Sequence, residues 1–464
     1  MEVLTLRKRV LAAAALLASA AIGSATLATA APAKVLRVAT SGDYAPFSYS
    51  SKSSGGTDAD LDGFDLAVAR QFARERGYRI EIVRFQWPNL GLELAAGSFD
   101  VAMSGVTVRV ERSISGRFSV PVAATHAVAL SWRGSGSATR QELDAPSHRV
   151  AVNAGGHLEQ VARDVFHGAK VTALPDNDAV RMALFDRSFD AVLSDNFEQR
   201  AWTAGSRDIV AIGPLSDDRK AYLLPADRAA LAAELDLFLI ERERDGTLSK
   251  LRARYFGEGA ETMATAEPVT ALAAAAVERL ALMPLVYDAK RRLGKPVEDK
   301  TQEVAVLDAA LRTLDEAAAA SGATRIDPDA SKRLFEALIG MGRDEQQRLF
   351  ERDGGQRPGV VLHSRPDGST LAEVTATPPQ PEASPRAAAP AHGYDLASEL
   401  RPAISRITEK IARIVLTIDR PLDSVEVRRI LDAALAARGV RSERIEALSD
   451  SIVGLSAARS ASPH

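Results

Sequence analysis

The chain of 464 residues contains no cysteine. It can therefore form no disulfide, and no mature N-terminal cysteine is available to carry a lipid anchor. The chain also lacks an excess of charge of either sign, because 58 basic residues balance 61 acidic ones. A nucleic-acid-binding protein would need a basic surface, so we expect no nucleic-acid partner and a small-molecule ligand instead.

The N-terminus has the pattern of an export signal. Arg7, Lys8 and Arg9 precede the apolar run VLAAAALLASAAIG, and the small residues ATA follow at a position typical of a cleavage site. The apolar run is shorter than the ~20 residues that span a bilayer, which argues against the alternative of a membrane anchor. We expect residues 1–30 to be a signal peptide and the mature protein to be periplasmic, without stable membrane association.

Two regions of different pattern follow, and a chain of this length is too long for a single hydrophobic core. Over residues 31–258, short apolar segments alternate with amphipathic ones, which predicts an α/β domain with largely parallel sheets. Over residues 259–464 strand patterns vanish, and Ala-rich helical patterns predict an all-α domain. The expected helices are 269–293, 303–320, 331–350, 396–417 and 422–438. A proline- and alanine-rich segment at about 354–393 is too poor in apolar residues to fold alone, so we expect a disordered loop.

The stretch LSDNFEQR places two carboxylates, Asp195 and Glu198, where a buried strand is expected to turn into a helix. The spacing fits a reciprocal capping box, in which Asp195 is the N-cap and Glu198 the N3 residue, with no ligand involved. The same two carboxylates could instead serve a binding or catalytic site, so both interpretations stay open at this point.

Four segments of the first region, SGDYAPFSY, GFDLAVA, FDVAMSGVTVRVER and KAYLLP, together resemble the type II periplasmic solute-binding fold. The resemblance implies two lobes that close over an amino-acid-like ligand, whose carboxylate is held by Arg112 and the segment before it. A guanidinium meets a carboxylate in a planar fork, although a solvated turn is the alternative for Arg112. The residues placed around the ligand are Tyr44, Phe47, Trp87, Ser104, Gly105, Thr107 and Arg112.

A closer resemblance, to the periplasmic cyclohexadienyl dehydratases, comes from QWPNLGLEL, VNAGGHLEQVA, LPDND and LSDNFEQR. These enzymes convert prephenate or arogenate into phenylpyruvate or phenylalanine without a metal or cofactor. The resemblance implies that Glu198 is the general acid, with a raised pKa, and that Asp195 occupies the position where binding proteins meet an α-amino group.

The same resemblance assigns the substrate's second carboxylate. Asn153 and the amides of the AGG turn are expected to hold it at a helix N-terminus. Lys220 is a candidate further cation, with a solvated surface lysine as the alternative. His157 departs from the family pattern, which has Thr or Ser there, and leaves the choice between prephenate and arogenate open.

In the helical region, Arg279 and Lys290 are eleven residues apart and share a stripe with Met283 and Val286. Pro284 should kink this helix because it lacks a backbone donor. Spacing alone would favour two surface residues that pack the aliphatic part of the side chain on apolar surface and keep the charged group in water.

The segments ERLALMPLVYDAKRRLGKPVED, IDPDASKRLFEALI and RPAI resemble secreted all-helical chorismate mutases. The resemblance implies a pericyclic reaction that needs cationic grips and a hydrogen bond to the ether oxygen. Gln346, on the face of Phe335, Ile339 and Phe350, matches the residue that makes this hydrogen bond. The implied substrate contacts are Arg279, Lys290, Gln302, Gln346 and Arg401. Gln302 replaces a family arginine, which Lys300 could compensate, and Gly342 replaces a small hydroxyl residue.

Together these features predict a bifunctional exported enzyme of phenylalanine biosynthesis. Residues 259–464 would turn chorismate into prephenate, and residues 31–258 would dehydrate and decarboxylate prephenate or arogenate, because the product of one reaction is the substrate of the other. The alternative is an amino-acid solute-binding protein of an ABC importer with a degenerate helical appendage.

Overall fold

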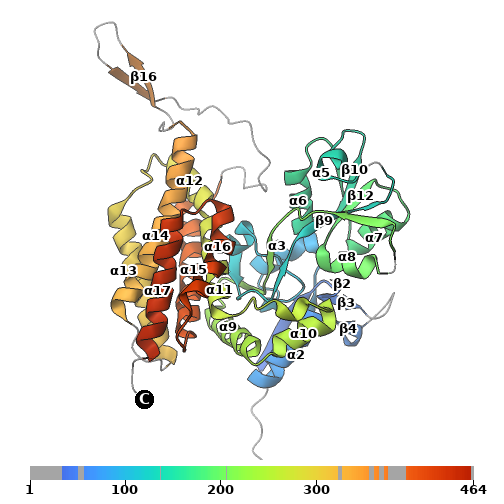
Figure 1. The fold of residues 1–464 in the computed structure, drawn as a ribbon, viewed down its shortest axis with the longest axis horizontal. Helices are drawn as coiled ribbons and strands as arrows, with labels where there is room; N and C mark the ends of the chain where they lie inside the picture. The colour runs from blue at the N-terminus through green and yellow to red at the C-terminus, as the bar shows by residue number, and fades with distance from the viewer. Residues whose placement is uncertain are drawn as a thin grey trace, which may run out of the picture.

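The computed structural model describes residues 34–50, 57–135, 137–204, 206–321, 327–354, 360–364, 370–374 and 393–460. The expected signal peptide, residues 1–30, lies outside these residues. Two α/β lobes lie on one side of the molecule and a helical domain on the other (Figure 1).

The first lobe is built on a five-stranded sheet of order β5-β1-β6-β15-β7. Its strands are β1 (Lys34–Thr40), β5 (Tyr78–Arg84), β6 (Val101–Ala102), β7 (Gly116–Phe118) and β15 (Leu223–Pro225). Its helices are α2 (Phe64–Arg76), α3 (Leu90–Ala95), α4 (Val110–Ser115), α9 (Ala229–Arg244) and α10 (Thr247–Phe256). A small second sheet comprises β2 (Asp43–Tyr44), β3 (Ser48–Ser50) and β4 (Leu61–Asp62). Helix α2 ends at Gly77, whose left-handed backbone (φ 73°) carries no steric cost in glycine.

The second lobe has a sheet of order β11-β10-β12-β9-β13. Its strands are β9 (Ala127–Trp132), β10 (Arg149–Asn153), β11 (Lys170–Leu174), β12 (Ala191–Asp195) and β13 (Ile209–Ile212). Its helices are α5 (Arg140–Leu143), α6 (His157–Val165), α7 (Asn177–Phe185) and α8 (Asn196–Trp202). The chain crosses between the lobes twice, and the crossing strands β8 (Ala123–Thr125) and β14 (Asp218–Lys220) pair antiparallel as a hinge.

The two-lobed α/β architecture confirms the fold expected for the first region, but the expectation of largely parallel sheets is only partly right. Strand β1 is parallel to β5 and β6, and β10 is parallel to β11 and β12. Strands β9 and β15, by contrast, run antiparallel to their neighbours. Each of these two strands directly follows a crossing, so the chain enters the sheet from the hinge and runs in the opposite direction.

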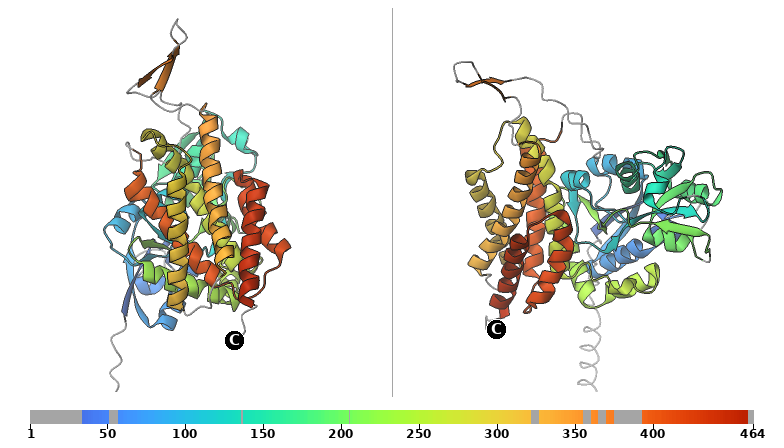
Figure 2. Two further views of the ribbon diagram at one scale, coloured as in Figure 1. Left: turned by 90° about the vertical axis from the view of Figure 1, so that its left-hand side faces the viewer. Right: turned by 45° about the horizontal axis from the view of Figure 1, so that its top comes forward.

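The helical domain is a bundle of long helices (Figure 2). They are α11 (Pro268–Ala281), α12 (Met283–Arg292), α13 (Lys300–Ser321), α14 (Pro328–Arg352), α15 (Arg401–Leu416), α16 (Ser424–Leu435) and α17 (Ser442–Ser460), with a π-helical turn, η4 (Leu396–Leu400), before α15. The helix break falls at Leu282, just before Pro284, as the missing proline donor predicts.

Two expectations for this region need correction. The segment expected as a disordered loop at about 354–393 contains the antiparallel pair β16 (Val360–Ser364) and β17 (Thr370–Val374), so strands do not vanish after residue 259. Their sequences VVLHS and TLAEV alternate apolar and polar residues in part, which is a strand pattern, while the rest of that loop up to residue 392 lies outside the described residues. Helix α17 was missed because its apolar positions are interspersed with small polar ones.

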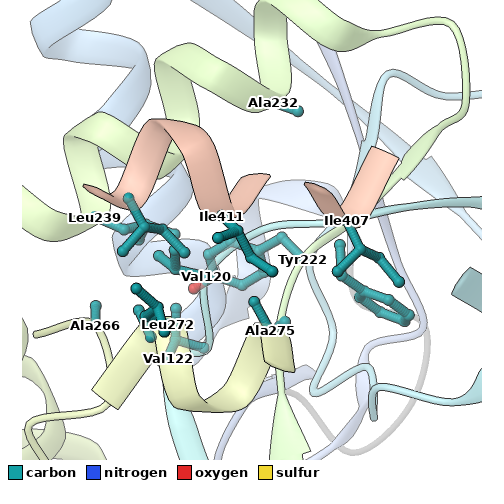
Figure 3. Close-up of a cluster of buried hydrophobic side chains, with 14 of the residues drawn as sticks. Val120, Val122, Tyr222, Ala232, Leu239, Ala266, Leu272, Ala275, Ile407 and Ile411 are labelled. Carbon is teal, nitrogen blue, oxygen red and sulfur yellow. The ribbon is translucent and has the colours of Figure 1, made fainter. Parts of the chain in front are cut away.

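One cluster of buried apolar side chains runs from the first lobe into the helical domain. Figure 3 shows members from both sides, among them Val120, Tyr222, Leu272, Ile407 and Ile411. The helical domain is therefore packed onto the first lobe through a shared core.

Helices α11 and α12 together, Pro268–Arg292, are long and apolar enough to cross a membrane by length and composition alone. However, 67% of the apolar window is buried inside the protein, and the buried charges of Glu278 and Arg279 lie within these helices. We interpret the segment as a core element of the bundle.

Candidate functional site

The turn between β12 and α8 distinguishes the roles of the two carboxylates in LSDNFEQR. Asp195 caps α8, since its Oδ1 accepts the backbone N–H of Phe197 at 2.8 Å and of Glu198 at 3.0 Å. The Glu198 side chain does not reciprocate as a capping box requires; its Oε2 accepts the hydroxyl of Ser194 at 2.7 Å. Capping thus explains Asp195 and leaves the Glu198 carboxyl unexplained.

Glu198 lies in an environment that disfavours its charged form. The residue is only 2% exposed. Burial first, and then the neighbouring carboxylate of Asp195, raise the pKa of Glu198 well above its ordinary value. A carboxyl group in this state is shifted toward the neutral form that can donate a proton.

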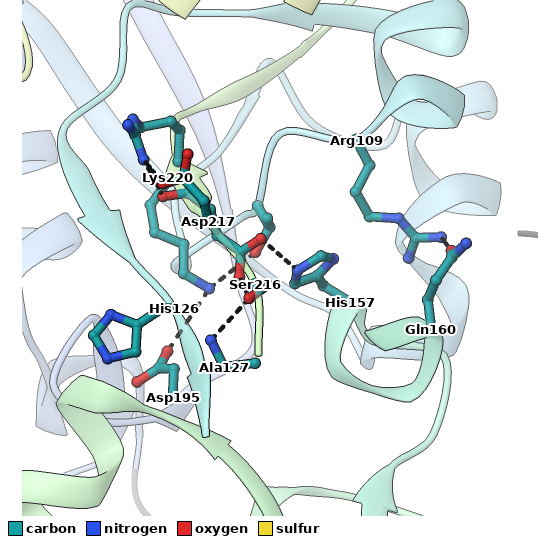
Figure 4. Close-up of polar contacts among 12 residues, drawn as sticks. Arg109, His126, Ala127, His157, Gln160, Asp195, Ser216, Asp217 and Lys220 are labelled. Atoms are coloured by element: carbon teal, nitrogen blue, oxygen red, sulfur yellow. Dashed lines mark hydrogen bonds and ion pairs between the residues drawn. The ribbon is translucent and has the colours of Figure 1, made fainter. Parts of the chain in front are cut away.

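Lys220 supplies a buried cation beside these acids. It is 5% exposed, and its Nζ donates to the Tyr44 hydroxyl at 2.8 Å and to Thr107 Oγ1 at 2.9 Å. Nζ also lies 3.8 Å from Asp195 Oδ2, as Figure 4 shows, and the Tyr44 hydroxyl donates to the same carboxylate. Burial lowers the pKa of Lys220. The alternative of a solvated surface lysine is therefore wrong.

A small pocket of about 20 Å³ lies between the lobes. Its lining residues are Tyr44, Trp87, Gly105, Thr107, Arg112, Asn153, Gly156, His157, Leu158, Asn177 and Lys220. Most of the expected ligand contacts are thus brought together, and Asn177, which follows the N-cap of α7, was missed because nothing in LPDND marks it as ligand-facing. Asp195 and Glu198 do not line this pocket; Tyr44, which does, donates its hydroxyl to Asp195.

Two of the expected contacts have other partners. Ser104 is fully buried, and its hydroxyl accepts the backbone N–H of Ser41 at 3.1 Å. The Gly105 N–H donates to the buried carboxyl of Asp65, whose pKa burial raises to about 7. Gly105 is nevertheless required here, because its φ is 63° and a Cβ would lie 2.4 Å from the Tyr44 ring. Phe47, also expected around the ligand, is fully buried in the core.

The pocket offers a cation for an anionic ligand. Arg112 is half-buried and donates to the Thr107 carbonyl at 3.0 Å, so it is held in place rather than solvated. Burial lowers the pKa of Arg112 to about 9, which leaves the guanidinium charged at neutral pH.

Two buried atoms in the pocket lack protein hydrogen bonds among the described residues: Asn153 Oδ1 and His157 Nδ1. Unpaired buried polar atoms of this kind are ready to meet a ligand. His157 Nε2 lies 2.8 Å from Asp218 Oδ1, an interaction drawn in Figure 4. Burial lowers the pKa of His157, so the imidazole is neutral at neutral pH.

A second, larger cavity of about 270 Å³ lies within the helical domain. It brings together six of the residues expected there from the sequence: Arg279, Lys290, Gln302, Gly342, Gln346 and Arg401. These residues come from α11, α12, α13, α14 and α15, so the cavity is formed by the bundle as a whole.

Arg279 is a buried cation in this cavity. The residue is 7% exposed, and its Nη1 donates to the Leu338 carbonyl at 2.7 Å. Within the described part of the chain no carboxylate pairs with it, and burial lowers its pKa to about 10. Burying an unpaired charge costs roughly several kcal/mol of folding free energy, and an anion bound beside the charge reduces this cost. The burial of Arg279 therefore indicates that the cavity can bind an anion.

Lys290 and Gln346 face the same cavity. Lys290 Nζ donates to the Val297 carbonyl at 2.8 Å, and burial lowers its pKa. Gln346 is 6% exposed; its Nε2 lies 3.2 Å from the Gly342 carbonyl, and its Oε1 has no partner among the described residues. Because amide nitrogen and oxygen exchange by a flip, this side chain can present a donor to a ligand.

A different cation from the expected one lies in the cavity with Gln302. Lys300 is exposed and does not line the cavity, so that hypothesis is wrong. Arg343 lines it instead, with Nη1 3.0 Å from Glu303 Oε2. Gly342 and Gln346 lie one turn apart on a single face of α14, and the cavity is wide enough to include the adjacent residue Arg343 as well.

The described residues include no group of three or more His, Asp or Glu side chains placed to hold a metal ion.

Residues 36–258 match the model of bacterial extracellular solute-binding proteins, family 3. Cyclohexadienyl dehydratase from Pseudomonas aeruginosa is 33% identical over 219 residues, which span 46% of this chain and 80% of that protein. The L-cystine-binding protein TcyJ from Escherichia coli (strain K12) is 25% identical over 224 residues, 48% of this chain and 82% of that protein.

Among solved structures, the ancestral amino-acid-binding protein AncCDT-1, described as a precursor of cyclohexadienyl dehydratase, is similar to this chain. It is 26% identical, with a TM-score of 0.44, over 48% of this chain and 95% of that one. Through residues 36–258, the chain belongs to family 3 of the bacterial extracellular solute-binding proteins.

Proposed function

We propose that the protein is a bifunctional exported enzyme that converts chorismate to prephenate in the helical domain, 259–464, and prephenate or arogenate to phenylpyruvate or phenylalanine in the α/β domain, 31–258. The observation that carries the dehydratase half is the buried carboxyl of Glu198, which has a raised pKa and takes no part in the cap that Asp195 forms. A solute-binding site needs no proton donor at this position.

In the dehydratase reaction, the ring hydroxyl of prephenate leaves as water and its ring carboxylate leaves as CO₂. The departing hydroxyl takes one proton, which Glu198 gives as general acid, while the electrons of the broken C–C bond complete the aromatic ring. Arg112 and Lys220 are the cations for the two carboxylates, and Asn153 adds a polar contact. Separation of the lobes about β8 and β14 would break the contact of Tyr44 with Asp195 and admit the substrate.

In the mutase reaction, a pericyclic rearrangement breaks the ether C–O bond while a C–C bond forms, and no acid, base or nucleophile is needed. A cavity that holds the dianion in its compact conformer and stabilises the charge on the ether oxygen is sufficient. The unpaired Arg279, with Lys290 and Arg401, supports the binding of the carboxylates. Gln346 is the donor for the ether oxygen.

The rival proposal is an amino-acid solute-binding protein, and relatives such as TcyJ, named as L-cystine-binding, favour it. The position of Lys220 argues against it. With Nζ 3.8 Å from Asp195 Oδ2, Lys220 already supplies a cation beside the carboxylate that the resemblance would pair with a ligand's α-amino group. A second cation there would be repelled, whereas a dianion would be attracted.

The test is to supply prephenate, and separately chorismate, to the purified protein and to follow phenylpyruvate by absorbance. Formation of phenylpyruvate from both compounds supports the bifunctional proposal. Tight binding of an amino acid without turnover of prephenate would favour the importer component.

A further inference from the structure

Helix α4 lies between the two candidate sites. Its residue Arg112 lines the cleft of the α/β domain, and the next residue, Ser113, contacts the helical domain. The Ser113 hydroxyl donates to Glu278 Oε1 at 2.8 Å, and Glu278 directly precedes Arg279 of the helical cavity. Arg112 is therefore connected to Arg279 through its chain neighbour Ser113, the hydrogen bond from Ser113 to Glu278, and the peptide bond from Glu278 to Arg279.

A second contact holds the C-terminal end of α4. Arg406 of α15 donates to the carbonyls of Ser113 at 3.2 Å, Ile114 at 2.6 Å and Gly116 at 3.0 Å. Its neighbour Ser405 lines the helical cavity. The last carbonyls of a helix have no partners within it, and a helix as short as α4 is not stable alone, so its position depends on such contacts.

The contact to Ser113 is built into the domain interface. Glu278 pairs with Lys410, and these two side chains are only 6% and 5% exposed. Ser113 is 2% exposed. A buried ion pair contributes little net stability because of its desolvation cost, but it fixes geometry closely when its hydrogen bonds are complete. This arrangement suits a positioning role.

We propose that Arg406 and Glu278 of the helical domain are positioning residues for the cleft, because they fix α4 and with it the carboxylate-binding Arg112. This inference rests on the proposed role of Arg112 in binding prephenate. The helical domain is then needed for the dehydratase reaction even when prephenate is supplied directly, and the two sites share α4 as a coupling element.

The experiment compares Arg406→Ala with Arg413→Ala in the full chain. Arg413 is the matched control: it lies two turns further along α15 and also crosses to the first lobe, but its Nη2 bonds to Asp236 on α9 at 3.2 Å. Amide hydrogen exchange over residues 110–116 reports on α4, and the KM and kcat for prephenate report on the cleft. Arg406→Lys, which keeps a positively charged donor nitrogen at this position, tests whether the conservative change restores the prephenate KM.

We expect Arg406→Ala to accelerate exchange over 110–116 and to raise the prephenate KM about tenfold with a smaller change in kcat, since a small misplacement of a binding group is costly. Arg413→Ala should leave both readouts within about twofold, and Arg406→Lys should restore part of the KM. Unchanged exchange in Arg406→Ala, or equal KM changes in the Arg406 and Arg413 variants, would overturn the proposal. If exchange rises as expected but even the unaltered protein fails to bind prephenate, the positioning of α4 stands and the proposed function fails.

Discussion

The substitution Glu198→Gln separates catalysis from structure most sharply. Glutamine keeps the size of the side chain and can still meet the Ser194 hydroxyl, which lies 2.7 Å from Glu198 Oε2. It cannot give a proton to a leaving hydroxyl. Removal of a general acid costs about 10² to 10⁴-fold in kcat, which is about 3 to 5 kcal/mol of activation free energy.

The same substitution should not destabilise the protein. Because the pKa of Glu198 is raised in the folded state, the folded protein retains a proton that the unfolded chain releases as the pH rises above about 4.5. The stability contributed by this group is therefore highest at low pH and falls as the pH rises toward the folded pKa. Glutamine cannot ionise, so at pH 8 the variant should melt at the same temperature as the unaltered protein or higher.

The assay follows phenylpyruvate formation from prephenate as a function of pH, beside thermal melts of both proteins. The dehydratase rate of the unaltered protein should fall at high pH as Glu198 ionises, and the variant should lose the activity at every pH while converting chorismate to prephenate normally. A variant that retains more than about a tenth of the dehydratase kcat would refute the role of Glu198 as general acid.

The remaining predictions concern the cations of the two sites. Arg279→Ala should lower the chorismate mutase kcat/KM by about thirty- to a thousandfold, because transition-state contacts of this kind contribute ~2 to 4 kcal/mol. Prephenate turnover should stay unchanged, and equal loss of both activities would contradict two separate sites. Arg343→Ala should lower mutase activity about tenfold as the cation that replaces the missing family arginine, and an unchanged mutase kcat/KM would exclude it. Lys220→Met should raise the prephenate KM about ten- to hundredfold, since a hydrogen bond to a charged group contributes ~1.5 to 3 kcal/mol; steady-state kinetics with prephenate measures this, and tighter binding would contradict the assignment.

The sequence predicts much of the fold because hydrophobic periodicity is local. The strands of the first region and the break before Pro284 follow from patterns within a few residues. Strand direction after a crossing, as in β15, and the pairing of β16 with β17 depend on contacts between distant segments. Local patterns do not contain these contacts.

The candidate sites show the same division. The segments that carry the resemblances led to most of the residues that line the pocket between the lobes, and to six residues of the helical cavity. The resemblances did not show that Ser104 and the Gly105 amide have partners within the protein, nor that Arg343 lines the helical cavity. Burial and hydrogen-bond partners arise only when the chain is folded.

The most direct test of two cooperating sites in one chain is a mixing experiment. Arg279→Ala and Glu198→Gln are each supplied with chorismate, alone and then together. Separately, the first should leave chorismate unconverted and the second should accumulate prephenate, and the mixture should form phenylpyruvate because prephenate passes through solution from one variant to the other. Absence of phenylpyruvate from the mixture, when the unaltered protein forms it, would contradict two separate sites linked by free prephenate.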